Sequence, residues 1–184
     1  MWRQGYLSHQ RGESFYGGLP GASPASLNIC LVAGLGGLII VGLETWGESA
    51  LNISAEQSEI TVLFGLYKLV AAIIEEIIFR GYLVPNERRG RWIRWEAIIG
   101  ASVVFAALHP FLWSWEDSEW EWTFTTKGWF STAAVFVSSL WFYTVRFLPG
   151  NPHRSLLPCF VAHASKNLAV FAVKAAQGFV VARW

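Results

Sequence analysis

Five long apolar stretches alternate with short polar segments along the chain. An α-helix rises about 1.5 Å per residue, so about 20 apolar residues are enough to cross the hydrocarbon core of a membrane. The pattern therefore predicts an all-α fold, a polytopic transmembrane helical bundle of about five spans. We expect those spans at residues 27–43, 60–84, 95–113, 128–148 and 156–182.

The polar segment before the first span has a different character. Residues 1–26 contain several glycines and prolines, which predicts an irregular or surface-lying lead-in. Residues 27–184 then form one transmembrane core in which no internal repeat stands out. Within the first span, Ala33 and Gly37 place two small residues one turn apart, which favours close packing against another helix.

The composition favours a membrane protein over a soluble one. Charged residues make up 15 % of the chain, against about 25 % in a soluble domain, and apolar residues make up 53 %. The net charge of +1 leaves no basic footprint for nucleic acid. Cys30 and Cys159 are isolated, so the sequence contains no CxxC pair or disulfide framework. The partner that composition predicts is therefore the lipid bilayer.

The charges of the polar segments alternate in sign along the chain. The arginines are Arg3, Arg11, Arg88, Arg89, Arg91, Arg94, Arg146 and Arg154, and the acidic residues between them are Glu44, Glu48, Glu56, Glu59, Glu116, Asp117, Glu119 and Glu121. Cytoplasmic loops carry an excess of Lys and Arg, so we expect the N-terminus and lead-in in the cytoplasm and the C-terminus outside. A bacterial inner (plasma) membrane is the expected location. The second acidic segment is flanked by interfacial aromatic residues, namely Trp113, Trp115, Trp120, Trp122 and Trp129.

Three of the apolar stretches contain polar groups that a bilayer penalises. A charged residue at the centre of a span costs at least about 2.5 kcal/mol, so such residues mark a functional site by default. The second stretch contains Glu75, Glu76 and Arg80, the third ends in His109-Pro110, and the fifth contains His163 and Asn167. We expect three helices to share one interior polar site.

Helical geometry suggests how these residues divide the chemistry. Glu76 and Arg80 are four residues apart and lie on one face, where they can form an ion pair. Glu75 is turned about 100° from Glu76, which leaves it free to act as a general base and acid. His163 and Asn167 are also four residues apart and suit the binding of a developing oxyanion. Pro110 is expected to end or kink the third helix beside His109.

The three groups together resemble the CPBP family of glutamic-type intramembrane proteases, which includes CAAX proteases and bacteriocin-processing proteins. The resemblance extends over about residues 70–170 and consists of Glu75-Glu76-x-x-x-Arg80, Phe105-x-x-x-His109 and His163-x-x-x-Asn167, in the family's order and each in a predicted helix. It implies an intramembrane endopeptidase that cleaves a membrane-associated protein or peptide. It also implies that Glu75 and His109 activate a water, that His163 and Asn167 stabilise the oxyanion, and that Glu76 and Arg80 support them.

Two questions stay open at this stage. The residues favour a mechanism without a cofactor, but Glu75, His109 and His163 are also a formal set of three zinc ligands. A non-catalytic membrane scaffold or chaperone of the same family is the alternative function, and a proton-coupled transporter is favoured less because the chain shows no inverted repeat. The sequence identifies neither the substrate nor the oligomeric state.

Overall fold

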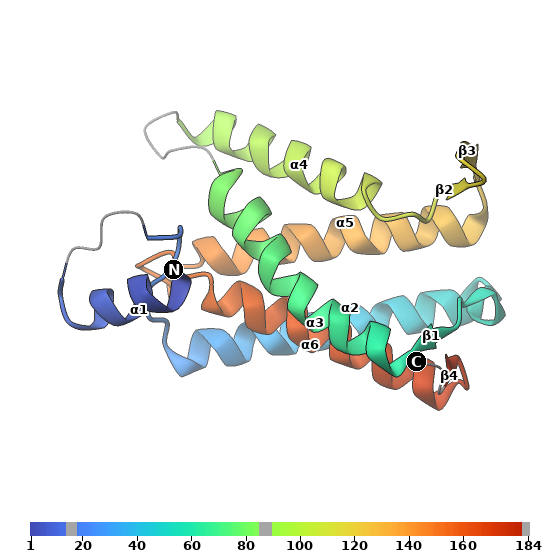
Figure 1. Cartoon of the computed structure of the whole chain (residues 1–184), viewed down its shortest axis with the longest axis horizontal. Coiled ribbons are helices and arrows are strands. Elements are labelled where there is room, and N and C mark those ends of the chain that lie inside the picture. The colour runs from blue at the N-terminus through green and yellow to red at the C-terminus, as the bar shows by residue number, and fades with distance from the viewer. Residues whose placement is uncertain (14–17, 85–89, 182–184) are drawn as a thin grey trace.

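The protein is a bundle of long helices, seen here in a computed structural model whose described residues are 1–13, 18–84 and 90–181 (Figure 1). Its helices are α1 (Trp2–Gln10), α2 (Leu27–Ala50), α3 (Val62–Glu76), α4 (Arg91–Ala107), α5 (Thr126–Phe147) and α6 (Leu157–Ala176), with the 3₁₀ turn η1 (Ser54–Glu56) and the π-helical turn η2 (Ile77–Tyr82). Short strands are β1 (Ile60–Thr61), β2 (Trp113–Glu116), β3 (Glu119–Trp122) and β4 (Val180–Val181). The predicted all-α class is confirmed at the level of a mostly helical fold.

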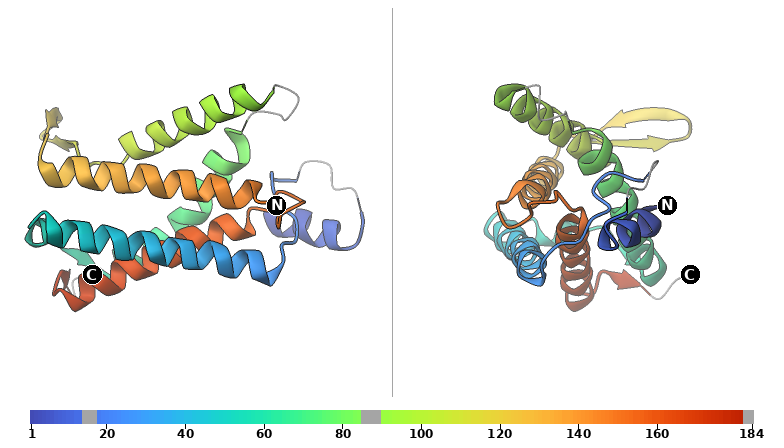
Figure 2. Two further views of the ribbon diagram at one scale, coloured as in Figure 1. Left: turned by 180° about the vertical axis from the view of Figure 1, so that it is seen from behind. Right: turned by 90° about the vertical axis from the view of Figure 1, so that its left-hand side faces the viewer.

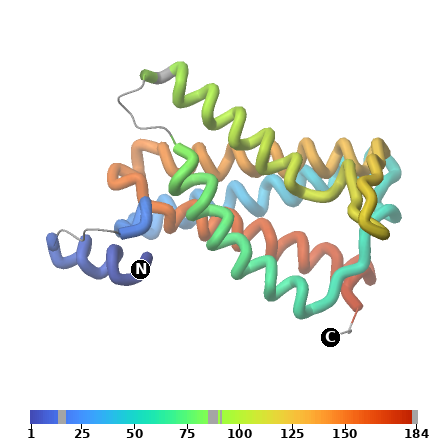
Figure 3. The backbone as a smooth tube through the Cα atoms, turned by 45° about the horizontal axis from the view of Figure 1, so that its top comes forward, coloured from blue at the N-terminus to red at the C-terminus, as the bar shows by residue number. Residues whose placement is uncertain are grey.

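Consecutive helices from α2 to α6 run in opposite directions, so the chain passes five times between two ends of the bundle (Figures 1 and 3). Helix α1, the start of α4 and the α5–α6 connection lie at one end, and the β2–β3 hairpin, β1 and β4 lie at the other. The arginine-bearing segments and the acidic segments predicted from the sequence therefore gather at opposite ends. Arg88 and Arg89 lie outside the described residues.

Side-chain oxygens start three of the five long helices. Ser26 accepts a hydrogen bond from the backbone N–H of Ile29, Thr61 from that of Phe64, and Thr125 from that of Gly128. Each bond satisfies one of the N–H groups that a helix leaves without an internal partner at its first turn. Local sequence thus fixes where α2, α3 and α5 begin.

Helices α2 and α6 form the most extensive helix–helix contact among the described residues. A Cβ atom added to Gly37 would lie 2.6 Å from the carbonyl oxygen of Ala162, so the two backbones touch there. Ala33 is fully buried, and its carbonyl accepts a hydrogen bond from the indole N–H of Trp141. The predicted packing through Ala33 and Gly37 is confirmed, and it draws α5 in beside the other two helices.

Two buried apolar clusters hold the bundle together. The first joins α2, α5 and α6, and the second joins η2, α4 and α5. Their buried members are Ala33, Phe142, Val145, Leu156, Cys159 and Ala162 in the first cluster and Phe79, Phe105, Ala106 and Val135 in the second. The polar site lies where these clusters adjoin, because Phe142 and Phe105 both contact its side chains.

The lead-in is more ordered than the sequence analysis expected. Part of it forms α1, where Trp2 packs edge-on against Phe160 of α6 with ring centroids 5.4 Å apart. Farther along, the hydroxyl of Ser155 donates to the carbonyl of Ser23 over 2.5 Å. An aromatic contact and a hydrogen bond from a side chain to the backbone, rather than sequence periodicity, therefore fix this segment to the bundle.

Helix α2 continues past the apolar stretch that predicted it. Residues 44–50, expected in a polar loop, form its last two turns, and two of them are acidic. Glu44 pairs with Lys166 of α6 over 3.3 Å, and Glu48 pairs with Lys127 of α5. These ion pairs allow the helix to extend beside its neighbours beyond the apolar stretch that ends at Leu43.

The second acidic segment forms a hairpin that projects from the bundle (Figure 2). Its antiparallel register places Trp113 opposite Trp122 and Trp115 opposite Trp120. Side chains alternate between the two faces of a strand, so one face is lined by tryptophans and the other is acidic. The sequence analysis read these tryptophans as flanking a loop, and the strand pairing is a feature it did not predict.

Within the described residues, α2 is the helix whose length and apolar composition suffice by themselves for a membrane crossing. Much of the outer surface of α2 and α3 is nonetheless apolar, with Leu35, Ile39, Leu66 and Val70 each more than half exposed. The positions of all five spans in a membrane stay a prediction.

Candidate active site

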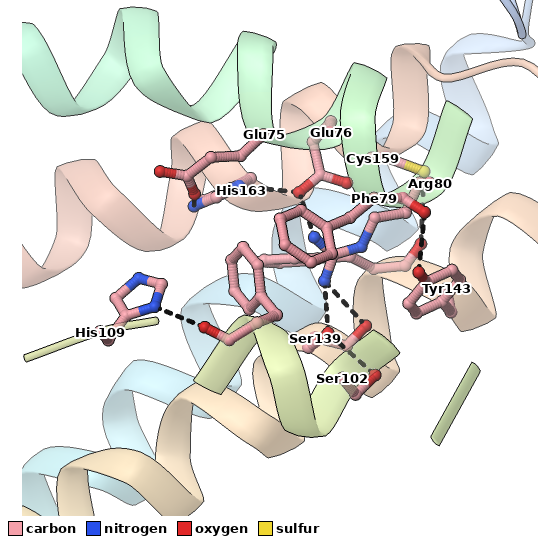
Figure 4. Close-up of polar contacts among 12 residues, drawn as sticks. Glu75, Glu76, Phe79, Arg80, Ser102, His109, Ser139, Tyr143, Cys159 and His163 are labelled. Atoms are coloured by element: carbon pink, nitrogen blue, oxygen red, sulfur yellow. Dashed lines mark hydrogen bonds and ion pairs between the residues drawn. The ribbon is translucent and has the colours of Figure 1, made fainter. Parts of the chain in front are cut away.

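Polar side chains from three elements meet in the interior of the bundle (Figure 4). Glu75 and Glu76 end α3, Arg80 lies in η2, and His163 lies on α6. His109 follows the end of α4, which stops at Ala107, before Pro110, as the proline predicted. The sequence positions are far apart, so the site exists only when α3, α4 and α6 are packed together.

Glu76 and Arg80 form the predicted ion pair, and both side chains are completely buried. The Nη1 atom of Arg80 lies 3.2 Å from Oε1 of Glu76. Its Nη2 atom donates to the carbonyl and the hydroxyl of Ser139 over 3.2 and 2.6 Å, and the Ser139 hydroxyl donates to that of Ser102 over 2.9 Å. A buried charge needs such partners, because an unpaired one would carry a desolvation cost on the order of several kcal/mol.

Aromatic rings enclose the guanidinium of Arg80. Its Cζ atom lies 4.5 Å from the ring centroid of Phe105, 4.9 Å from that of Tyr143 and 5.1 Å from that of Phe142. A planar guanidinium is attracted to aromatic faces and stays charged inside a protein. Arg80 is therefore a fixed cation behind Glu76 and has no access to a substrate.

A local widening of the helix accompanies this pair. Residues 77–82 form a π-helical turn, in which the N–H of Leu83 donates to the carbonyl of Ile78, five residues earlier. The hydroxyl of Tyr143 donates to the carbonyl of Phe79 over 2.7 Å and so satisfies a backbone group in this turn. Such turns are rare and occur often at functional sites.

His163 lies between the two consecutive glutamates. Its Nδ1 atom is 2.8 Å from Oε1 of Glu76, and its Nε2 atom is 3.7 Å from Oε2 of Glu75. An ionised carboxylate only accepts hydrogen bonds, so Nδ1 carries the proton toward Glu76. Phe142 stacks on the imidazole with ring centroids 4.6 Å apart. The ring is thereby fixed with its Nε2 atom toward Glu75.

His109 is held by its own backbone. Its Nδ1 atom lies 2.8 Å from the carbonyl oxygen of Phe105, and a carbonyl only accepts, so Nδ1 donates. In the neutral imidazole the Nε2 atom is then a free acceptor. In Figure 4 the imidazole of His109 and the carboxylate of Glu75 lie on the same side of the buried Arg80.

A cavity of about 480 Å³ connects the polar side chains around the buried Glu76–Arg80 pair. Glu75, His109, His163 and Asn167 all line it. From Glu75 the cavity extends toward the acidic end of the bundle, where its walls come from α2, α5 and α6. The volume is within the range of ligand-binding pockets and has room for a water and a length of extended peptide.

The match to known families agrees with the motifs. A model of the Rce1-like type II CAAX prenyl endopeptidases matches residues 57–169, more than half of the chain. The chain belongs to this family. Searches of curated proteins and of solved structures found no match.

The Rce1-like match contains the whole polar site. It begins just before β1 and ends within α6, so it includes all six residues predicted from the motifs, namely Glu75, Glu76, Arg80, His109, His163 and Asn167. The Rce1-like proteins are membrane-embedded proteases, which agrees with the predicted family and with the broad functional class. Helices α1 and α2 lie before the matched region.

His163 and Asn167, which the sequence analysis predicted as one oxyanion site, have different hydrogen-bond partners in this Rce1-like protein. His163 contacts the glutamates, whereas the amide nitrogen of Asn167 donates to the carbonyl of Lys68 on α3 over 3.0 Å. An amide has two N–H groups, so one remains for a ligand in the cavity that both residues line.

Sequence reasoning missed the polar residues on α4 and α5 that hold the Rce1-like site in place. Ser102, Ser139 and Tyr143 are buried and bond to Arg80, to each other or to the backbone of η2. A serine within an apolar helix is a weak signal of a polar site, because its hydroxyl donates as readily to a backbone carbonyl of its own helix. Ser138 does so, with the carbonyl of Ala134 over 2.7 Å.

No group of three or more His, Cys, Asp or Glu side chains arranged to hold a metal occurs among the described residues. Of the three formal zinc ligands, His163 has one ring nitrogen on Glu76 and the other toward Glu75. His109, His163 and Glu75 all line the cavity, with the Nδ1 atoms of the two histidines already bound to Phe105 and Glu76.

Proposed function

We propose that this Rce1-like protein is an intramembrane endopeptidase that hydrolyses a peptide bond of a membrane-associated protein or peptide. The observation that carries the proposal is the different environment of two consecutive carboxylates. Glu76 is completely buried and bound to Arg80 and His163, whereas Glu75 is partly exposed and lines the cavity. A general base must reach its substrate, and Glu75 is the carboxylate that can.

In the proposed reaction Glu75 removes a proton from a water in the cavity. The Nε2 atom of His109 accepts the water's second hydrogen bond and orients it, because Nδ1 is already bound to Phe105. The hydroxide adds to the carbonyl carbon of the scissile bond, and the carbonyl oxygen becomes an oxyanion. Glu75 then passes its proton to the leaving amine as the C–N bond breaks.

The oxyanion is proposed to bind His163 and Asn167. Donors that are already positioned stabilise developing charge without reorganisation, and removal of one typically costs about 10²–10³ in kcat. His163 is held by Glu76 and by stacking on Phe142, and Asn167 is held by the Lys68 carbonyl. When His163 is protonated, its Nε2–H is the donor nearest to Glu75.

The proposed mechanism uses no cofactor. It needs only the base Glu75, the acceptor His109 and the groups proposed to bind the oxyanion, all of which line the cavity. A zinc-dependent mechanism is the alternative, in which Glu75, His109 and His163 would be the ligands. Activity that survives exhaustive chelation, with elemental analysis of the same sample, distinguishes the two mechanisms.

We further propose an orientation with the arginine-bearing end in the cytoplasm, in a bacterial inner membrane. Cytoplasmic segments are enriched in Lys and Arg, and α1, the start of α4 and the α5–α6 connection share one end of the bundle. In this orientation the acidic hairpin, at the opposite end of the bundle, lies outside. Exposed tryptophans on that hairpin suit the membrane interface.

The deciding experiment compares the termini of membrane proteins in cells that express the wild type or Glu75→Gln. The substitution removes the base and keeps the size of the side chain, so a new protein terminus should appear only with the wild type. Glu59→Gln, an exposed position outside the cavity, is the matched control and should behave as the wild type does. Identical termini with the wild type and Glu75→Gln would contradict the proposal and favour a non-catalytic scaffold.

A further inference from the structure

Three arginines from different elements meet around the ring of Phe147, at the arginine-bearing end of the bundle. The Cζ atoms of Arg94 on α4, Arg146 on α5 and Arg154 in the α5–α6 connection lie 5.5, 5.9 and 4.8 Å from the ring centroid. Each guanidinium is attracted to the aromatic ring, but like charges that converge repel one another. This group, which we call the arginine cluster, is therefore a favourable place for an anion.

Arg146 is buried without a counter-ion. The residue is 8 % exposed, and its Nε and Nη1 atoms are enclosed with no hydrogen-bond partner in the described part of the chain. No carboxylate within residues 1–13, 18–84 and 90–181 forms an ion pair with it. Arg80 is also buried, but it has Glu76 as its ion-pair partner. Because a buried unpaired cation is costly, an anion from outside the chain would stabilise Arg146. Its Nη2 atom is not enclosed in the same way and is the nitrogen that such an anion can reach.

Asn151 fixes the α5–α6 connection against the end of α5. Its side chain is buried, and its amide nitrogen donates to the carbonyls of Arg146 and Ser155 over 3.0 and 2.9 Å. Its Oδ1 atom accepts the backbone N–H of Ser155 over 2.9 Å. The backbone at Arg154 is therefore held beside that of Arg146 before any ligand binds. A site on a fixed backbone needs little ordering when an anion enters it.

An apolar surface on α4 begins next to the arginine cluster. Helix α4 lies at the edge of the bundle (Figure 2), and its residues Trp95, Ile99 and Val103 are each about half exposed. Residues four positions apart lie on one face of a helix, so these side chains form a stripe that leads away from the arginine-bearing end. We call this surface the α4 stripe. A ligand that covers both surfaces has an anionic end and a long apolar part.

We propose that the arginine cluster binds the phosphate of an anionic phospholipid whose acyl chains lie along the α4 stripe. Free phosphate would bring a similar charge, but a lipid also covers the stripe. Arg146 lies near the end of the span expected at residues 128–148, which is the level of the lipid headgroups. Basic pockets between membrane helices are known binding sites for anionic headgroups. This inference goes beyond the proposed peptidase function and does not depend on it.

The test measures lipid binding to the purified full-length protein in detergent by native mass spectrometry, and the unfolding temperature of the same samples. The probes are phosphatidylglycerol, phosphatidylcholine and inorganic phosphate. Both lipids have a phosphodiester and acyl chains, but phosphatidylcholine has no net charge. We expect the wild type to bind phosphatidylglycerol about tenfold to a hundredfold more tightly, a difference typical of one charge-assisted interaction. Phosphatidylglycerol should also raise the unfolding temperature, because it binds the folded protein.

Variants assign this preference to the arginine cluster. Arg146→Met should bind both lipids equally, and without lipid it should be as stable as the wild type or more stable, because the buried unpaired charge is gone. Arg154→Asn should also weaken the preference, and asparagine tolerates the φ of 52° at this position better than arginine does. Arg3→Gln, at an exposed position on α1 at the same end of the bundle, is the control and should bind as the wild type does.

The outcomes separate the possible ligands and roles. Equal binding of the two lipids by the wild type overturns the inference, as does a preference that survives in both Arg146→Met and Arg154→Asn. Stabilisation by inorganic phosphate as great as that by phosphatidylglycerol would mean a site for free phosphate and overturn the lipid. A loss of stability in Arg146→Met that is equal with and without lipid would show a purely structural role. If Arg146→Met fails to fold, Arg154→Asn and the control still decide. Glu75-dependent cleavage is a separate measurement, so the proposed function does not fall with this inference.

Discussion

The Nδ1 atom of His163 lies 2.8 Å from Oε1 of Glu76, although 87 positions separate the two residues in the chain. The same oxygen accepts the hydrogen bond from Arg80. One buried carboxylate oxygen thus positions both the cation on one side and the imidazole on the other. Glu76 acts through these two side chains, which leaves Glu75 to face the cavity.

Removal of the buried Arg80 cation should lower the free energy of unfolding more than removal of the Ser102 hydroxyl. Arg80→Ala leaves Glu76 charged, buried and without its ion pair, and we expect a loss of about 3–5 kcal/mol in the free energy of unfolding. Ser102→Ala removes one hydroxyl–hydroxyl bond and should lose about 1 kcal/mol. Unfolding in detergent measures both, and equal losses would contradict the central position of Arg80.

His109 should matter for catalysis and little for stability. His109→Gln removes the acceptor that is proposed to orient the water, so kcat should fall about 10²–10⁴-fold. The side chain is only half-buried and bonds within its own segment, so the unfolding midpoint should change little. Peptide cleavage and unfolding are measured on the same sample. His9→Gln, an exposed histidine on α1, is the control, and equal activity in both variants would argue against the proposed role.

Two glycines on α2 should respond in opposite ways to the same substitution. Gly37→Ala places a methyl group 2.6 Å from a backbone oxygen of α6, and moving the helices apart should cost about 1–3 kcal/mol. Gly42 has no atom within 4 Å of an added Cβ, and Gly42→Ala should be neutral or add up to about 1 kcal/mol. Unfolding in detergent compares the pair. Similar values would mean that α2 and α6 are less closely packed.

The proposed orientation predicts which end of the bundle reacts with a membrane-impermeant maleimide. In a background with Cys30→Ala and Cys159→Ala, Glu119→Cys in the hairpin should react in intact cells. His153→Cys in the α5–α6 connection should react only after the membrane is opened. Both positions are exposed, so access to solvent does not separate them. The reverse pattern would place the arginine-bearing end outside.

Features that depend on neighbouring residues in the chain were accessible from the sequence. The Glu76–Arg80 pair follows from four-residue spacing, the end of α4 from Pro110, and the close contact at Gly37 from a stripe of small residues. The long helices follow from the apolar stretches. Each of these needs only the geometry of one helix.

Features that depend on how helices cross were not accessible. The angle between α3 and α6 decides that His163 meets Glu76 and that Asn167 meets the carbonyl of Lys68, and no spacing within α6 encodes that angle. Ser139 likewise becomes a partner of Arg80 only through the packing of α5. The hairpin lies between these two cases. Its tryptophan and polar residues alternate with the period of a strand, which the sequence shows. The same tryptophans also suit a membrane interface, so the pattern alone did not indicate a hairpin.

The π-helical turn is a segment in which the chain can lose one residue without rotating the helical residues on either side. A π turn contains more residues than the α-helical turn it replaces, so loss of one residue between Ile77 and Tyr82 permits regular helix. If the lost residue lies before Arg80, the spacing of Glu76 and Arg80 falls from four residues to three. In this segment a single-codon deletion therefore acts on the buried ion pair and leaves α3 as it is.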